Sequence, residues 1–292
     1  MTERTLRHYR ESHRAIQKYF DQRKMSSLTS EEAQRFINAY GQGEPPFSKP
    51  HAKETVDKLM VHVKAAIKQA TKDDIFRVSP ADDISSVWKN EPQSEKTKFL
   101  SEEDQIKLRR VVLNKLSSPV DYLILVGLDT GMRPGELLGL TWNNLDLKKN
   151  MVHVVQTWNY VEMKIDKVKM DRPCDVTITP ALSKLLLSYR EEQDSDFVFA
   201  ASTGGPMSTS YLSRELKKRQ EEANIDQKIN PHGLRHSHAS LMLYRGMDIK
   251  ALSKRLGHKN IQITLNKYAH ILDEMQAQQD KIVEETISKF YE

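Results

Sequence analysis

The segment Asn230-Pro231-His232-Gly233-Leu234-Arg235-His236 gathers cationic and imidazole side chains in a short stretch. If it opens a helix, His232, Arg235 and His236 stand at positions i, i+3 and i+4 and share one face. Arginine offers a planar fork of donors that fits a phosphate, and histidine can donate or relay a proton. The segment therefore predicts a helical face that binds an anion.

The same histidines, His232 and His236, have the HxxxH spacing of a metal site. A zinc site is disfavoured because no third ligand of the usual kind is nearby and no glutamate lies between them. The adjacent arginine would also repel a cation. We therefore expect no metal ion on this face.

An upstream segment, Thr130-Gly131-Met132-Arg133-Pro134-Gly135-Glu136, contains a second candidate arginine. Pro134 suits the first turn of a helix, where its missing N–H would be unpaired in any case. Arg133 then lies at a helix N-terminus, where the helix dipole is positive, so this arginine should face an anion. The alternative is a surface arginine paired with Glu136, three residues on.

Downstream, Leu256-Gly257-His258 reads as the end of a helix, with Gly257 just past its last turn. Asn260 can cap a following helix, and Tyr268 comes ten residues after His258. A single tyrosine most often packs in a core, so Tyr268 becomes a candidate only through the motifs that precede it.

Taken in order, these segments resemble the tyrosine recombinase (phage integrase) family. That family has an arginine in a TGxRxGE box, a lysine in a β-hairpin, an HxxRH box, an LGH box and a tyrosine shortly afterwards. The order and the spacings agree here. The resemblance is strong over residues 98 to 275 and weak over residues 1 to 89, which resemble the family's helical core-binding domain.

The resemblance implies a role for each matching residue. Tyr268 would be the nucleophile that forms a 3′-phosphotyrosine, and Arg133 and Arg235 would clamp the phosphate oxygens. His232 and His258 would hydrogen-bond the phosphate or assist proton transfer. Glu136 and His236 would be supporting residues.

A hairpin lysine would protonate the leaving 5′-oxygen by the same resemblance. Lys167 is the preferred residue, followed by Lys169 and then Lys164. The register of the hairpin stays open, because Pro173-Cys174-Asp175 separates the basic Arg172 from the strand residue Val176.

The chemistry calls for these residue types. Two fixed arginines stabilise the charge that builds up on a pentacoordinate phosphorus, where a metal ion might otherwise do so. A tyrosine with a pKa of about 10 needs help to lose its proton, and an alkoxide leaving group needs an acid. Because the covalent link preserves the bond energy, we expect no nucleotide, metal or other cofactor.

The expected fold is mainly α with a small β-sheet. A helical core-binding domain spans residues 1–89, a polar linker spans 90–98, and a mixed α/β catalytic domain with a C-terminal tail spans 99–292. Strands are expected at Met151–Thr157 and Cys174–Ile178. The apolar Val120–Leu128 segment predicts a buried helix.

Composition is consistent with a nucleic-acid partner inside a bacterial cell. The 292 residues carry a net charge of +5, and the pI is near 9.0. The single cysteine, Cys174, rules out a disulfide framework within the chain and favours the cytoplasm, with association to the nucleoid. The most apolar stretch, Tyr122 to Leu128, is too short to span a bilayer, and no signal peptide is expected.

The helix expected around Val56 to Ile67 interleaves lysines with its apolar positions. Lys53, Lys64 and Lys68 are candidates for contacts with DNA phosphates. A solvated helix face is the alternative reading of the same pattern.

The expected function is integration and excision of a mobile element such as a prophage or conjugative transposon. The alternatives are a Xer-type recombinase that resolves chromosome dimers and a catalytically idle DNA-binding regulator. The expected partners are double-stranded DNA attachment sites, further copies in a synaptic tetramer, and an excisionase or a host architectural protein. The tail, Ile271–Tyr291, is expected to pack on a neighbouring protomer or to fold back in cis.

Overall fold

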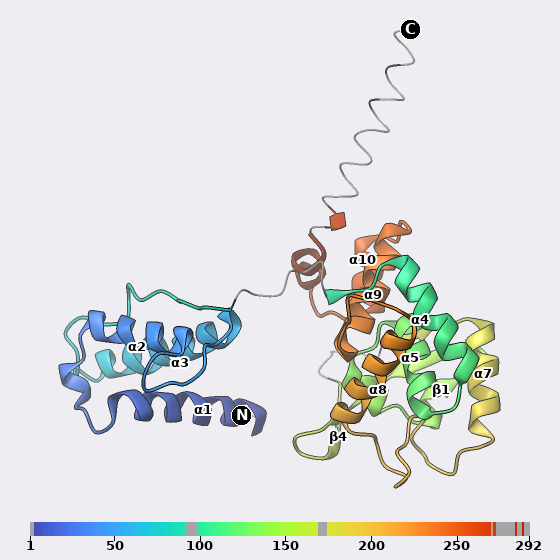
Figure 1. The fold of residues 1–292 in the computed structure, drawn as a ribbon, viewed down its shortest axis with the longest axis horizontal. Coiled ribbons are helices and arrows are strands. Elements are labelled where there is room, and N and C mark those ends of the chain that lie inside the picture. Colours follow the sequence, from blue (N-terminus) through green and yellow to red (C-terminus); the bar gives the residue numbers. More distant parts are fainter. Residues whose placement is uncertain are drawn as a thin grey trace. The chain divides into compact units, whose positions relative to one another are not determined.

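The structure is a computed structural model that describes residues 3–90, 98–168, 174–269, 271–272, 284 and 288. The chain divides into two compact units, Met1–Gln93 and Ser94–Glu292 (Figure 1). The expected linker is largely outside the described residues, and so is most of the expected C-terminal tail. The described part is mainly helical with two small antiparallel sheets, which confirms the expected fold class.

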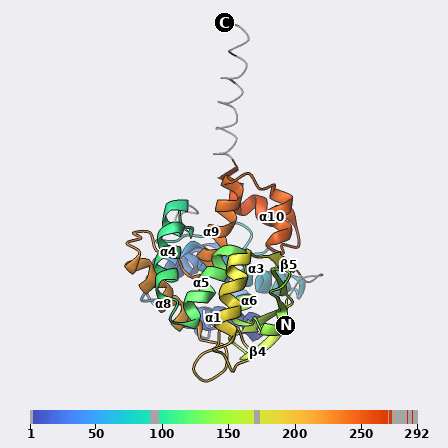
Figure 2. The same cartoon turned by 90° about the vertical axis from the view of Figure 1, so that its right-hand side faces the viewer.

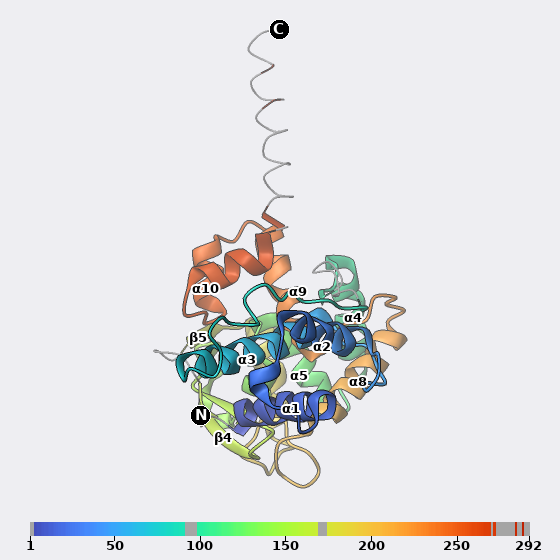
Figure 3. The same cartoon turned by 90° about the vertical axis from the view of Figure 1, so that its left-hand side faces the viewer.

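The first unit consists of helices (Figure 3). Its elements are α1 (Glu3–Phe20), η1 (Met25–Ser27), α2 (Ser30–Gln42) and α3 (Lys53–Lys72). Both α1 and α2 pack against α3, and Phe36, Val56 and Leu59 are almost fully buried between them. The Thr29 hydroxyl accepts from the N–H of Glu32, whose carboxylate accepts from the N–H of Thr29. This capping box fixes the start of α2.

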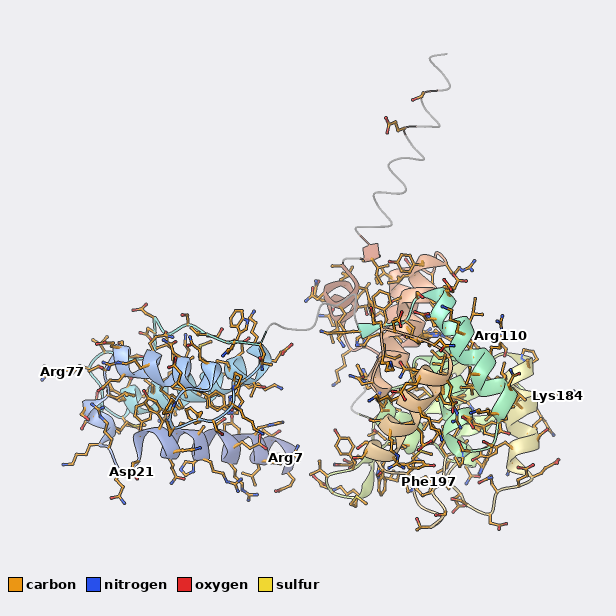
Figure 4. All side chains as sticks on the ribbon, in the orientation of Figure 1. Arg7, Asp21, Arg77, Arg110, Lys184 and Phe197 are labelled. Carbon is orange, nitrogen blue, oxygen red and sulfur yellow. The ribbon has the colours of Figure 1, made fainter. Side chains whose placement is uncertain are left out.

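The second unit is built around one buried helix, α5 (Pro119–Thr130). Leu123, Ile124 and Val126 on different sides of α5 are all fully buried, because other helices surround it (Figure 2). These are α4 (Glu102–Lys115), α6 (Pro134–Leu138), α7 (Pro180–Arg190), α8 (Thr209–Glu222) and α9 (Pro231–Tyr244). Polar side chains such as Arg110 on α4 and Lys184 on α7 face solvent (Figure 4).

The remaining helical elements of this unit are shorter. A 3-10 turn, η3 (Trp142–Asn144), follows α6, and α10 (Ile249–Arg255) follows α9. Residues 261–269 are helical, and the side chain of Asn260 accepts from the N–H of Gln262. This confirms the cap and the helix that the sequence predicts before Tyr268.

The β-structure forms two small sheets. One has the order β1 (Leu145–Asp146), β2 (Met151–Val154) and β5 (Cys174–Thr177), and the other pairs β3 (Gln156–Asn159) with β4 (Lys164–Lys167). The single strand expected over residues 151–157 is therefore wrong. The chain changes partners at Val155, since Val154 pairs with Cys174 whereas Gln156 pairs with Lys167.

A buried ion pair joins α5 to α8. Asp121 is fully buried and accepts from Nε of Arg219 at 2.7 Å and from Nη2 at 3.2 Å. Its carboxylate also accepts from the backbone N–H of Ser118 at the start of α5. One carboxylate thus caps α5 and neutralises the cation that α8 brings into the core.

None of the helices in the described residues is long and apolar enough to cross a membrane.

Candidate active site

The N-terminus of α9 is set by Asn230, Pro231 and a close approach at Gly233. The Asn230 side chain accepts from the N–H groups of His232 and Gly233, at 2.9 and 3.1 Å. A Cβ on Gly233 would lie 2.6 Å from Cβ of Ile229 and 3.0 Å from the carbonyl oxygen of Lys98, so a glycine is required here. The rings of His232 and His236 lie edge to face with centroids 4.9 Å apart, which confirms that they share a face.

Arg235 is buried and ties three distant segments together. Its Nη1 donates to the carbonyl oxygen of Gly131 at 2.8 Å, and its Nη2 donates to that of Leu256 at 2.7 Å. Nη2 also lies 2.8 Å from Nε2 of His258. Burial, followed by the positive charge of Arg133, lowers the pKa of Arg235 to about 10. The guanidinium still remains charged at neutral pH, inside a site that excludes most water.

The tautomer of His258 follows from these contacts. A guanidinium can only donate, so Nε2 of His258 accepts from Arg235 and the ring proton lies on Nδ1. Nδ1 then donates to the Thr264 hydroxyl at 2.7 Å. Burial, followed by the charges of Arg235 and Arg133, lowers the pKa of His258 to about 3. His258 is therefore neutral, and both of its ring nitrogens are engaged.

The turn before His258 has the geometry that the sequence predicts. Gly257 has a φ of 64°, in the left-handed region, and it ends the helical turn after α10. The N–H of His258 donates to the carbonyl oxygen of Ser253. The turn therefore delivers His258 to Arg235 with a fixed backbone.

Arg133 is the N-cap residue of α6, as predicted, and it is also paired with Glu136. Its Nη1 donates to Oε1 of Glu136 at 2.7 Å, and its backbone N–H donates to Oε2 at 2.8 Å. Glu136 is only 5% exposed, so this carboxylate sets the orientation of the arginine. The structure thus shows the pairing with Glu136, and the charge of Arg133 also reaches Arg235 and His258.

His232 belongs to the same electrostatic cluster. Burial is the main cause that lowers the pKa of His232 to about 3, and the charges of His236, Lys267, Arg235 and Arg133 add to it. An imidazole surrounded by cations stays neutral, since a further positive charge would be repelled. The site therefore combines charged arginines with neutral histidines.

Tyr268 lies beside this cluster and is nearly buried, with 2% of its surface exposed. Its ring packs against Ala239, Leu243 and Leu252 of α9 and α10. Its hydroxyl oxygen lies 3.2 Å from Nδ1 of His236. Tyr268 is near enough to Arg235 to raise the pKa of the guanidinium, so the phenol and the guanidinium share one electrostatic environment.

Of the three candidate hairpin lysines, the structure describes Lys164 and Lys167. The hairpin packs on α6 through two close approaches, since a Cβ on Gly135 would lie 2.6 Å from Oγ1 of Thr157 and one on Gly139 would lie 2.7 Å from N of Trp158. Lys167 ends β4 and is exposed. Lys169 lies outside the described residues.

Lys164 is occupied by acidic partners. Its Nζ lies 2.5 Å from Oε2 of Glu162 and 3.8 Å from Oδ1 of Asp166. The hydrogen bond with Glu162 and the nearby negative charges raise the pKa of Lys164. A lysine held in this way is a weaker acid, which supports its place as the last of the three lysines.

Sequence reasoning missed a second arginine that braces the site. Arg255 donates to Nε2 of His238, to the carbonyl oxygen of Asp129 and to both oxygens of Thr177, over 2.8 to 3.2 Å. It thereby joins α10 to β5 and α5, one residue before the LGH box. No local pattern reveals it, because its partners lie 17 to 126 residues away.

The lysines expected to contact DNA lie on α3 of the first unit. Lys64, Lys68 and Lys72 line a surface depression of about 500 Å³ together with Asp82. Lys53 places its Nζ 5.0 Å from the ring centroid of Trp88.

In the described part of the chain, no group of three or more His, Cys, Asp or Glu side chains is arranged to hold a metal ion.

The geometry agrees with comparisons to known proteins. The model of the phage integrase family matches residues 98–275. The chain belongs to this family. It is therefore a tyrosine recombinase, an enzyme that breaks and rejoins DNA at specific sites.

Relatives and solved structures extend the likeness to most of the chain. The integrase of Staphylococcus phage L54a is 25% identical over 296 residues, covering 90% of this chain and 81% of that protein. A XerC-like tyrosine recombinase of Caldanaerobacter subterraneus is 25% identical over 280 residues, covering 85% of this chain and 69% of that protein. The Tn1549 transposon integrase, solved in complex with a circular intermediate DNA, shares the fold with a TM-score of 0.79 at 21% identity. That match covers 96% of this chain and 94% of that one.

Proposed function

We propose that this recombinase integrates and excises a mobile element, with Tyr268 as the nucleophile that forms a 3′-phosphotyrosine link to DNA. The observation that carries the proposal is that separate sequence motifs contact Arg235 or its neighbour His236. Its guanidinium contacts the TGxRxGE segment and the LGH segment, while the next residue, His236, contacts the hydroxyl of Tyr268. Hydrogen bonds of Arg235 and His236, two adjacent residues of α9, therefore link the other three motifs to the HxxRH box.

Arg133 and Arg235 are the proposed clamp for the scissile phosphate. Burial strengthens the attraction of the Arg235 guanidinium for an anion, because little water remains to screen it, whereas the Arg133 side chain is 37% exposed. Glu136 holds Arg133 through Nη1, and backbone carbonyls hold Arg235, so neither arginine must be ordered when DNA arrives. Loss of one such preorganised donor costs about 3 kcal/mol of transition-state stabilisation.

His232 and His258 are proposed to contact the phosphate oxygens. Both are neutral in the DNA-free protein. A phosphate placed between the arginines would favour the protonated form of each histidine, because an anion stabilises a nearby positive charge. His258 could then donate from Nε2, the nitrogen that accepts from Arg235 before DNA binds.

Lys167 is proposed as the acid that protonates the leaving 5′-oxygen, with Lys169 as the supporting alternative. Lys167 is exposed on a hairpin that is anchored to the helix of Arg133. An exposed amine on an anchored hairpin can approach DNA bound at the arginines. This also explains why the acid comes from a hairpin and not from the buried helices.

The first unit is proposed to be a core-binding domain that grips DNA through Lys53, Lys64 and Lys68. The depression beside Lys64 and Lys68 is wide enough for a phosphate, and the lysines on its wall supply the charge. Assembly into a synaptic tetramer at attachment sites, and control by an excisionase or a host architectural protein, complete the proposal.

A mobile element is favoured over chromosome-dimer resolution because the chain resembles a phage integrase and a transposon integrase over most of its length. The XerC-like relative keeps the Xer-type function as the second candidate. Sequencing the DNA that flanks the gene separates the two, since an integrase lies beside its own attachment site. A gene far from any element end would favour the Xer-type function.

The chemistry is tested with a nicked duplex taken from the DNA that flanks the gene. The wild-type chain should form a covalent adduct that survives denaturing electrophoresis, and Tyr268→Phe should form none. Tyr160→Phe, which alters an exposed tyrosine at the hairpin, is the matched control and should react normally. An equal adduct from Tyr268→Phe would overturn the assignment of the nucleophile.

A further inference from the structure

His236 is the side chain in contact with the atom that would attack DNA. Its Nδ1 lies 3.2 Å from the hydroxyl oxygen of Tyr268, and the two rings meet edge to face with centroids 6.0 Å apart. His236 is 7% exposed and Tyr268 is 2% exposed. Water therefore has little access to this hydrogen bond, and the hydroxyl has a defined partner before DNA arrives.

The surroundings of His236 keep its imidazole neutral. Burial, together with the positive charges of Lys267, Arg235 and Lys98, lowers its pKa to about 4. The groups that face the ring come from every neighbouring element, namely Arg235 on α9, Lys98 before α4, Lys267 on the helix of Tyr268, and the neutral His258 after α10. His232, one turn earlier on α9, packs against the ring. A neutral imidazole has one nitrogen that can accept a hydrogen bond.

We propose that His236 is a catalytic residue of the recombinase, and that Nδ1 of its neutral ring accepts the hydrogen bond of the Tyr268 hydroxyl and so holds the nucleophile in position for attack. The inference rests on the proposed function, which makes Tyr268 the nucleophile. It gives His236 a direct contact with a reacting atom, beyond a supporting part in the HxxRH box.

The role is to position the hydroxyl and not to take its proton. A ring that already faces Lys267, Arg235 and Lys98 would gain a fourth positive charge by accepting a proton, and those charges oppose that. His236 therefore acts by holding the hydroxyl group of Tyr268 through the contact at Nδ1.

Placement matters because the nucleophile must lie in line with the scissile bond. A misplacement of about 1 Å can reduce the rate of an oriented reaction about 100-fold. Tyr268 belongs to an apolar cluster with Ala239, Leu243 and Leu252, and the hydrogen bond with His236 adds a polar contact that sets the direction of the hydroxyl group.

The test compares His236→Asn with His236→Ala in single-turnover cleavage of the nicked duplex at saturating DNA. An asparagine amide can place a hydrogen-bonding atom near the position of Nδ1, whereas alanine cannot. We expect His236→Ala to cleave about 10- to 100-fold more slowly, and His236→Asn to stay within about fivefold of wild type. DNA affinity should be unchanged in both, and the rate of His236→Asn should follow the wild-type dependence on pH between 5 and 8.

A duplex with sulfur in place of the bridging 5′-oxygen separates the nucleophile from the leaving group. A thiolate leaves without an acid, so this substrate should restore cleavage by Lys167→Ala and should not restore cleavage by His236→Ala. Rescue of His236→Ala would place His236 at the leaving group and overturn the inference. Equal defects in the Asn and Ala variants would also overturn it.

A stability measurement guards against a folding defect. If the hydrogen bond exists, Tyr268→Phe should lower the melting temperature in the wild-type background and have a smaller effect in the His236→Ala background. Additive effects would contradict the contact.

The two proposals also fail in different ways. An adduct formed by Tyr268→Phe refutes the proposed function. Normal cleavage by His236→Ala, with Tyr268→Phe inactive, refutes this inference alone.

Discussion

Acid should destabilise this protein through its buried histidines, and His238 gives the sharpest test. His238 is 2% exposed, and its Nε2 accepts from Arg255 at 3.0 Å. The ring proton therefore lies on Nδ1, which donates to the carbonyl oxygen of Leu128 at 2.9 Å. Burial, with the charge of Arg255 next, lowers the pKa of His238 to about 4. The native state thus requires a neutral imidazole.

The sign and the size of the effect follow from linkage. Between pH 6.5 and pH 4 the unfolded chain binds a proton at His238 and the native chain does not, so the free energy of unfolding falls as the pH falls. At pH 5 the decrease in the free energy of unfolding depends on the difference between the pH and the pKa of a histidine in the unfolded chain, which is about 6.5. This decrease amounts to about 2 kcal/mol. His236, also buried and with its pKa lowered to about 4, adds a loss of similar size.

Urea unfolding of the wild type and of His238→Gln at pH 7, 6 and 5 measures the contribution of His238. Glutamine cannot titrate, and its amide oxygen can still accept from Arg255. Between pH 7 and pH 5 the wild type should lose about 2 kcal/mol more than the variant, because carboxylates titrate equally in both. Identical pH dependence in the two proteins would refute the claim that His238 is held neutral.

Three further outcomes are expected. Asp121→Asn should cost about 3 to 5 kcal/mol in urea unfolding, because it leaves the buried Arg219 with only its longer contact to Glu222. A variant within about 1 kcal/mol of wild type, roughly the value of a surface ion pair, would contradict this. The double change of Lys64 and Lys68 to alanine should lower the slope of log affinity against log salt by about 2, and Lys184→Ala, which alters an exposed lysine of the other unit, should leave it unchanged. Adduct formation should be unaffected by excess EDTA, since the proposed clamp consists of arginines; a loss that added Mg²⁺ restores would refute a metal-free mechanism.

The sequence predicts the helix starts and turns that carry the motif residues well, because each is a local feature with a local physical cause. Pro134 after Arg133, Asn230 before His232 and Gly257 before His258 are helix starts and stops that act within a few residues. Helical spacing then decides which side chains share a face. These rules need no knowledge of the rest of the fold.

The parts that the sequence does not predict depend on contacts between distant segments. Arg255 acquires its role from Thr177 and Asp129, which lie 78 and 126 residues away. The split of the expected strand at Val155 likewise depends on which strands pair with the residues on either side. Alternating hydrophobicity marks a strand, but it does not name the partner strand.

The electrostatics of the site explain why its histidines and arginines must occur together. Buried Arg235 and partly buried Arg133 place positive charge around one space, and Glu136 is the carboxylate that pairs with Arg133. These positive charges, together with burial, lower the pKa values of the neighbouring His232 and His258. A phosphate entering this space would remove the repulsion, so the same groups that disfavour a charged His258 in the free protein would select an anion as the ligand. The depressed histidine pKa values and the proposed affinity for a phosphodiester therefore have the same origin, which is one arrangement of charges.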